Sequence, residues 1–143
     1  MSGEEDVRVA DVQAVFRHSA GKLGSHFLKT LRDEARFVGW RSGSPQRVAV
    51  PPRDLGMAGE WVDVGPNATL EAYAPNEWLQ TLGKPVDDGS CLALVRLDGA
   101  DCALLARVRL CGAPLEVGQS LIARFAETRT GAMTDVWFEP AGN

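Results

Sequence analysis

Between Trp40 and Trp61 the chain reads RSGSPQRVAVPPRDLGMAGE (residues 41–60), and this stretch decides the fold. It contains a turn, a short strand, a Pro-Pro-Arg corner and a second turn, a layout typical of a two-knuckle zinc ribbon. In such a ribbon, two closely spaced pairs of ligands converge on one tetrahedral Zn²⁺. None of the four ligand positions holds Cys or His, so we predict a degenerate, rubredoxin-type ribbon that binds no zinc. Those positions are Ser42, Pro45, Gly56 and Gly59.

Length and composition predict an ordinary globular protein. The chain has 143 residues, of which 45% are hydrophobic, enough to bury a core. A net charge of -4 argues against non-specific nucleic-acid binding, which needs a basic surface. No apolar run reaches membrane-spanning length, and the acidic start MSGEED lacks the layout of a secretion signal. We therefore expect a cytoplasmic protein that does not associate with a membrane.

The sequence shows no catalytic constellation. The cysteines, Cys91, Cys102 and Cys111, form no Cys-x-x-Cys pair and have apolar neighbours, so we expect reduced, buried thiols. The histidines, His18 and His26, have no Glu at metalloenzyme spacing. We assign no catalytic residue and no prosthetic group.

The clearest helical pattern precedes the ribbon. Apolar residues recur at helical spacing from Phe27 to Val38. This spacing predicts a helix over 25–38, with Ser25 as its N-cap and Gly39 as the left-handed residue that ends it. Residues 1–20 fit a short helix or an extended arm equally well.

After the ribbon the chain has the alternation of β-strands. The turn Asp98-Gly-Ala-Asp101 between two apolar runs predicts a hairpin. In its second arm Leu104, Ala106 and Val108 fall on one face and Arg107 and Arg109 on the other, as in a half-buried strand. Five or six short strands with one long loop favour a five-stranded OB-fold barrel. The expected strands are 61–64, 68–73, 91–97, 102–110, 120–127 and 134–138.

These pieces divide the chain into an N-terminal arm and helix (1–38), a degenerate zinc ribbon (39–60) and an OB-fold domain (61–143). In this order they resemble the acyl-CoA-associated family once catalogued as domain of unknown function thirty-five. The resemblance covers the chain apart from its first dozen or so residues. The matching stretches are FLKTLRDE (27–34), GWR (39–41), VAVPPR (48–53), EW (60–61), LVRLDG (94–99), LAR (105–107) and LEVG (115–118).

The resemblance implies a small, non-catalytic subunit. Members of the family pair with thiolase-like enzymes, or with hydratases that handle acyl-CoA, and complete or stabilise the partner's acyl-CoA site. The expected assembly is a heterotetramer with a thiolase-like catalytic subunit, with a coenzyme A thioester as ligand of the complex. Because no metal would support the ribbon, packing of Val48, Val50, Leu55 and Met57 on the helix or on a partner must do so, which favours an obligate complex.

Two groups of residues are candidates for contacts. Arg41, Arg47 and Arg53 surround the Pro-Pro corner and suit coenzyme A phosphates, although a solvated cluster or ion pairs with a partner would explain them too. Trp78, Leu79 and Leu82 lie in the irregular segment 74–90. They are expected either to contact a partner or acyl group, or to fold back over the barrel.

Two other classes of function compete with this interpretation. An OB-fold can bind single-stranded nucleic acid, and Arg96, Arg107, Arg109 and Arg124 would have to cluster for that purpose. A stand-alone hydratase or lyase would need an acid and base at recognisable spacing, which the sequence lacks.

Overall fold

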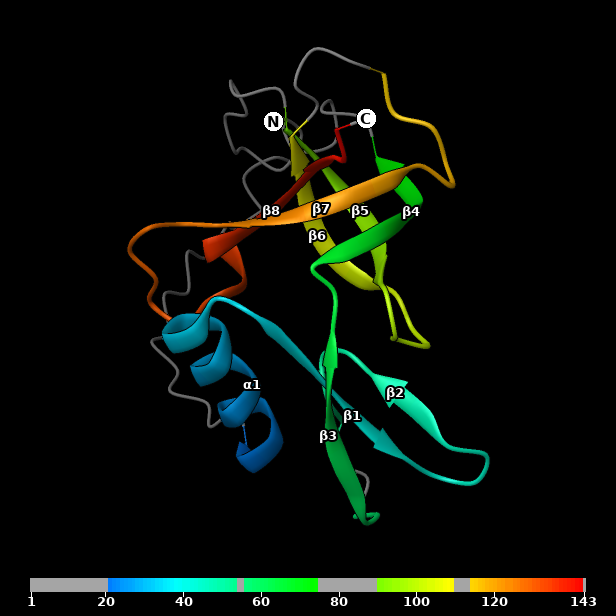
Figure 1. Cartoon of the computed structure of the whole chain (residues 1–143), viewed down its shortest axis with the longest axis vertical. Coiled ribbons are helices and arrows are strands. Elements are labelled where there is room, and N and C mark those ends of the chain that lie inside the picture. The colour runs from blue at the N-terminus through cyan, green and yellow to red at the C-terminus, as the bar shows by residue number, and fades with distance from the viewer. Residues whose placement is uncertain (1–20, 54–55, 75–89, 110–113, 143) are drawn as a thin grey trace, which may run out of the picture.

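The computed structural model describes residues 21–53, 56–74, 90–109 and 114–142. One α-helix and a three-stranded antiparallel sheet lie at one end, and a closed five-stranded barrel lies at the other (Figure 1). This confirms the predicted fold class, mainly β with an N-terminal helix and an OB-like barrel. Within the described part of the chain, no helix has the length and apolar character needed to span a membrane.

Helix α1 spans Gly21–Glu34, so the predicted bounds of 25–38 were wrong. Ser25 lies inside the helix. The left-handed residue that follows the helix is Ala35, with φ of 50°, and not Gly39. Phe37 and Val38 fit the helical spacing only by coincidence. Both are apolar because they begin a strand in which their side chains are buried.

The expected ribbon is an antiparallel sheet with strand order β2-β1-β3. Gly39 is needed in its central strand, because a Cβ there would lie 2.4 Å from Val48 Cγ1. The expected domain start at residue 61 falls inside β3, which pairs with β1 along its whole length and not with the barrel. The strands are β1 Phe37–Ser42, β2 Arg47–Ala49 and β3 Gly59–Val64.

The barrel closes in the order β4-β5-β6-β8-β7. The last strand, β8, lies between β6 and β7, as in the Greek-key barrel of an OB-fold. All its strand pairs are antiparallel except β6 with β8, which meet at Val108 and Phe138. A short 3-10 helix, η2 (Met133–Asp135), precedes β8. The strands are β4 Asn67–Ala74, β5 Ser90–Leu97, β6 Leu104–Arg109, β7 Ser120–Phe125 and β8 Val136–Pro140.

A single hydrophobic core runs through the helix, the ribbon and the barrel, and Phe37 lies at its junction. The ring of Phe37, 1% exposed, lies 6.2 Å from that of Phe27 on α1. It lies 5.5 Å from the ring of Phe125 on β7 and is stacked at 6.1 Å on Phe138 of β8. One side chain at the start of the ribbon thus joins the helix, the ribbon and the barrel.

We predict that Phe37→Ala lowers the free energy of unfolding by about 3–5 kcal/mol, because it removes the ring at the centre of this junction and leaves a cavity. Urea unfolding followed by circular dichroism measures the change. Val117→Ala, at a side chain that is 66% exposed, is the control and should change stability by less than about 0.5 kcal/mol. An equal effect of the two substitutions would contradict the role of Phe37.

Candidate functional site

Side-chain packing shapes the part of the ribbon in which zinc ligands would be expected. Ser42 ends β1 and lies opposite Gly59, which begins β3. A Cβ on Gly59 would lie 2.7 Å from Trp40 Cε2 and 2.5 Å from the Arg41 carbonyl oxygen, so the indole occupies the space that a ligand side chain would need. No group of three or more His, Cys, Asp or Glu residues with metal-binding geometry occurs in the described ranges. The other two positions, Pro45 and Gly56, lie in the connections on either side of β2.

Aromatic rings form a row across the ribbon and the helix. Trp40 and Trp61 lie directly opposite each other on β1 and β3, with ring centroids 5.0 Å apart and an edge-on packing. The ring centroid of His26, on α1, lies 4.4 Å from that of Trp61. Both tryptophans are half-buried. This row ties the outer part of the ribbon to the helix, and it gives His26 a packing role.

We predict that Gly59→Ala destabilises the protein by about 1–3 kcal/mol, because a methyl group there overlaps the Trp40 indole and the Arg41 backbone. Gly142→Ala is the matched control, since a Cβ there meets no atom within 4 Å. Thermal unfolding of the two variants measures the difference. Equal melting temperatures would show that the indole does not occupy this space.

The barrel holds the ribbon through the turn of the β5–β6 hairpin, which reaches β2 (Figure 1). The Val48 N–H donates to Asp101 Oδ2 at 2.7 Å, and the Asp101 N–H donates to the Val48 carbonyl at 3.0 Å. The Val50 N–H donates to Cys102 Sγ at 3.2 Å, and this thiol is 3.4 Å from the Val50 carbonyl. These contacts cover the edge of β2 that β1 does not pair with, so the edge is closed to other strands.

The predicted packing of the ribbon is confirmed in part. Val48 and Val50 are buried, at 8% and 1% exposure, whereas Met57 is 46% exposed. Leu55 lies outside the described residues. The ribbon is therefore supported by its own core and by the barrel hairpin on the side of β2.

The structure separates two of the arginines that were candidates for phosphate contact. Arg41 is the register partner of Val48, and Arg47 that of Ser42, so the two side chains leave the sheet on opposite faces. Arg41 also forms an ion pair with Glu60, with Nε 2.9 Å from Oε1. Arg47 and Arg53 are exposed. Arg41 and Arg47 therefore point away from each other, and the contact of these arginines with phosphates or a partner stays a prediction. Trp78, Leu79 and Leu82 lie outside the described residues.

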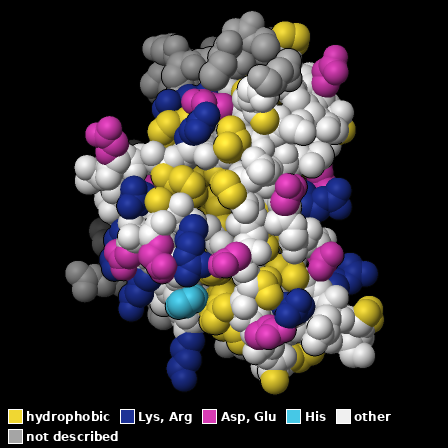
Figure 2. Space-filling model, in the orientation of Figure 1, with side chains coloured by type: hydrophobic (Ala, Val, Ile, Leu, Met, Phe, Trp, Pro, Cys, Tyr) yellow, Lys and Arg dark blue, Asp and Glu magenta, His cyan; other side chains and the backbone are white. Residues whose placement is uncertain are grey.

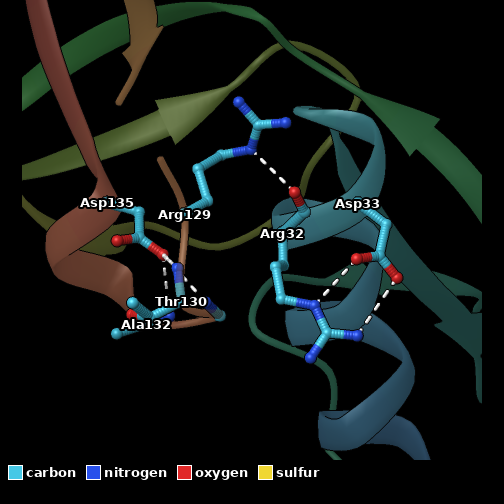
Figure 3. A network of polar contacts seen from close by, with 7 residues as sticks. Arg32, Asp33, Arg129, Thr130, Ala132 and Asp135 are labelled. Carbon is cyan, nitrogen blue, oxygen red and sulfur yellow. Dashed lines mark hydrogen bonds and ion pairs between the residues drawn. The ribbon is translucent and has the colours of Figure 1, made fainter. Parts of the chain in front are cut away.

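The connection between β7 and η2 docks on the C-terminal end of α1 (Figure 3). Arg129 Nε donates to the Arg32 carbonyl at 2.7 Å, which satisfies an acceptor in the last turn of the helix, and Nη1 donates to the Ala126 carbonyl at 2.9 Å. Asp135 Oδ2 accepts the backbone N–H groups of residues 130, 131 and 132 at 2.8, 2.9 and 3.1 Å. These hydrogen bonds, led by that of Ala132, lower the pKa of the Asp135 carboxyl group.

We predict that Asp135 contributes to the acid sensitivity of the fold. Its pKa is lower in the folded state, so the stabilisation is present above the unfolded pKa of about 3.9 and is lost as the pH falls through the folded value. Asp135→Asn keeps an acceptor oxygen but no charge. It should lower the melting temperature at neutral pH and flatten its fall between about pH 5 and pH 2.

Glu127→Gln, which removes an exposed carboxylate from the same connection, controls for net charge in this experiment. The prediction is wrong if the Asp135→Asn and wild-type melting curves lose stability in parallel over the acid range.

The two described cysteines are not arranged as nucleophiles. Cys91 is buried at 3% exposure, and burial raises the pKa of its thiol. Cys102 is free and exposed, against the expected burial, and lies in the hairpin turn. Its sulfur contacts the backbone of Val50. Neither is in a disulfide.

Part of the outer face of β4, β5 and β6 is apolar. Leu94 on β5 and Leu105 on β6 are register partners and are 40% and 57% exposed. They line a shallow groove of about 260 Å³ with Leu92, Tyr73 and small residues of β4 and β5. A second groove of about 210 Å³ shares Leu92 and Leu105 and extends to Met133 of η2. We call this surface the leucine face. It lies on the second and third barrel strands, the surface with which OB-folds bind ligands.

Next to the leucine face lies a strip of arginines around Trp137, which we call the Arg–Trp strip. The guanidinium carbon of Arg109 lies 4.0 Å from the centre of the Trp137 ring, and that of Arg107 lies 6.0 Å away. Trp137 Nε1 donates to Glu139 at 3.1 Å, and Arg124 pairs with the same carboxylate at 3.1 Å. Basic and hydrophobic side chains lie side by side over β7 and β8 (Figure 2).

Comparison with known proteins supports the fold. No protein-family model matches the sequence, and no curated protein does. Among solved structures, a protein of unknown function from the DUF35 family of Sulfolobus solfataricus is similar, with a TM-score of 0.58 and 17% sequence identity. The alignment covers 85% of each chain. The chain has the fold of a DUF35 protein. At this identity the likeness concerns the fold and not the function.

The leucine face was not identified from the sequence, although a signal for it was present. The alternation in β6 assigned Arg107 and Arg109 to the polar side, and Leu105 lies on that same side. An apolar residue on the polar side of a strand is the pattern that marks an exposed apolar surface.

Proposed function

We propose that this protein is a non-catalytic accessory subunit of an acyl-CoA-processing complex of the thiolase superfamily. In this proposal a thiolase, acyltransferase or aldolase partner carries the reacting groups. This chain stabilises the partner and helps to form its acyl-CoA site. The order of motifs along the sequence supports the proposal, and so does the likeness in fold to a DUF35 protein.

The observation that carries the proposal is the character of the leucine face. OB-folds that bind single strands present stacking aromatic rings in a positive groove on this surface. Here the groove is lined by leucine and alanine side chains and by one aromatic ring, that of Tyr73. Arg96 and Arg124, two of the arginines that a nucleic-acid groove would use, are paired with Glu71 and Glu139. The surface therefore favours a protein partner over a polynucleotide.

The chemistry of the described residues agrees with a non-catalytic role. A thiolase-type reaction needs an activated cysteine with a histidine as base. In the described part of the chain, Cys91 is a buried thiol of raised pKa, and His26 packs on Trp61. We propose that the coenzyme A thioester is a ligand of the assembled complex. The exposed Arg47 and Arg53 are then available to its phosphates or to the partner.

Co-expression of this chain with the thiolase-like proteins of the same genome tests the proposal. We expect a stable heterotetramer of two copies of each chain by light scattering. We also expect acyl-CoA turnover that is at least about tenfold faster than that of the catalytic subunit alone, a change of about 1.4 kcal/mol in barrier. The isolated chain should turn over no thioester.

Two results would overturn the proposal. One is thioester turnover by the isolated chain. The other is a catalytic subunit that has the same activity with and without this chain and does not associate with it. Association with an acyl-CoA hydratase instead would keep the accessory role and change the reaction.

A further inference from the structure

The ribbon sheet has one closed edge and one open edge. The outer edge of β2 is closed by Asp101 and Cys102 of the β5–β6 hairpin turn. The other edge is β3, which pairs with β1 along its whole length. Among the described residues, no backbone–backbone hydrogen bond joins β3 to any strand or loop other than β1. An open edge of this kind is a template for the addition of another strand.

The closed edge shows in which direction the backbone groups of the sheet point. Val48 on β2 both donates to and accepts from Asp101, so its N–H and C=O point away from β1. These groups alternate in direction along a strand, so the neighbouring Ala49 turns its groups toward β1, where its register partner is Trp40. The groups of Trp40 are therefore directed at β2, and those of the next residue, Arg41, at β3.

The same alternation shows which residues of β3 have outward-facing backbone groups. Arg41 is the register partner of Glu60, so Glu60 turns its groups toward β1 and every odd-numbered residue of β3 turns its groups outward. The open stretch ends at residue 63, because the N–H of Gly65 donates to the Asp98 carbonyl at 2.9 Å. The outward-facing residues are Gly59, Trp61 and Asp63.

An edge with this layout is complementary to a second copy of itself. Trp61 lies at its middle. If two β3 strands run antiparallel across a two-fold axis at Trp61, Gly59 of each copy faces Asp63 of the other, and the two Trp61 residues face each other. Every outward N–H then meets an outward C=O. The facing tryptophans form an aromatic cross-strand pair, a kind of contact that stabilises sheets.

The charges of β3 are compatible with this pairing. The strand carries two carboxylates and no basic residue, so strands of two copies would repel each other if the carboxylates were unpaired. Glu60 is paired with Arg41, and Asp63 with Arg36, within the same chain. In the register centred on Trp61, each carboxylate also lies opposite an uncharged residue. A second copy therefore supplies both the hydrogen-bonding pattern and an acceptable charge pattern by symmetry.

We infer that β3 pairs with β3 of a second copy of this chain and joins the two three-stranded ribbon sheets into one continuous antiparallel sheet. The inference goes beyond the proposed function and does not depend on it. It agrees with a complex that contains two copies of this chain, because the ribbon dimer would bring them together.

Sedimentation equilibrium of the purified full chain tests the inference. We expect a species of about 31 kDa, twice the 15.4 kDa of one chain. Asp63→Pro removes an outward N–H and places a ring at the edge, so it should raise the Kd of the dimer at least about tenfold. Asp63→Ala removes the same carboxylate but keeps the N–H. It is the matched control and should change the Kd less than about twofold, because the lost ion pair is exposed.

Hydrogen exchange of the wild-type amides, followed by NMR, gives a second readout that does not need the proline variant to fold. The N–H groups of residues 59, 61 and 63 should be protected in the dimer and should exchange faster on dilution. Those of residues 60, 62 and 64 should stay protected at all concentrations, because they are bonded to β1.

Four results would overturn the inference, and all of them leave the accessory role standing. The first is a wild-type chain that is a monomer at the highest concentration at which it stays soluble. The second is a folded Asp63→Pro variant that associates as wild type does. The third is equal weakening by the proline and alanine substitutions, which would assign the effect to the carboxylate. The fourth is a dimer in which residues 59, 61 and 63 exchange freely, because the second copy would then bind elsewhere.

Discussion

The packing of aromatic rings around Phe37 determines how the parts of this molecule are arranged. Its neighbours come from α1, β7 and β8, while Phe37 itself begins the ribbon. A small sheet such as the ribbon has too little apolar surface to fold by itself, so it depends on this shared core. The orientation of the barrel relative to the helix follows from the same contacts, with Arg129 adding a polar link to the last turn of α1.

Local patterns in the sequence predict much of this structure, because they report on the immediate surroundings of a residue. The alternation around Asp98-Gly-Ala-Asp101 predicts the β5–β6 hairpin correctly. The same reasoning placed the end of the helix too late. Phe37 and Val38 fit the apolar spacing of one more helical turn, but they are buried because they begin a strand. Gly39 is required by the approach of Val48 from a neighbouring strand, which no local pattern reveals.

Contacts between distant segments are the part that sequence patterns do not predict. The parallel pairing of β6 with β8 depends on barrel closure, and the hydrogen bonds from residues 101 and 102 to β2 depend on where the barrel sits. The candidate functional surfaces show the same difference between local sequence patterns and contacts formed by folding. Arg41, Arg47 and Arg53 are close in sequence, yet the sheet directs Arg41 and Arg47 to opposite faces. The leucine face combines residues from three strands, so it exists only once the barrel has formed.

The fit of the Trp40 indole against Gly59 has an evolutionary consequence. A cysteine introduced at position 59 would collide with the indole before it could bind a metal, and the other knuckle positions would still lack thiolates. A cysteine at position 59 would therefore cost stability without completing a ligand set. Trp40 would have to be replaced by a smaller residue before a ligand could be introduced at position 59. That replacement by itself would weaken the aromatic packing with Trp61 and His26.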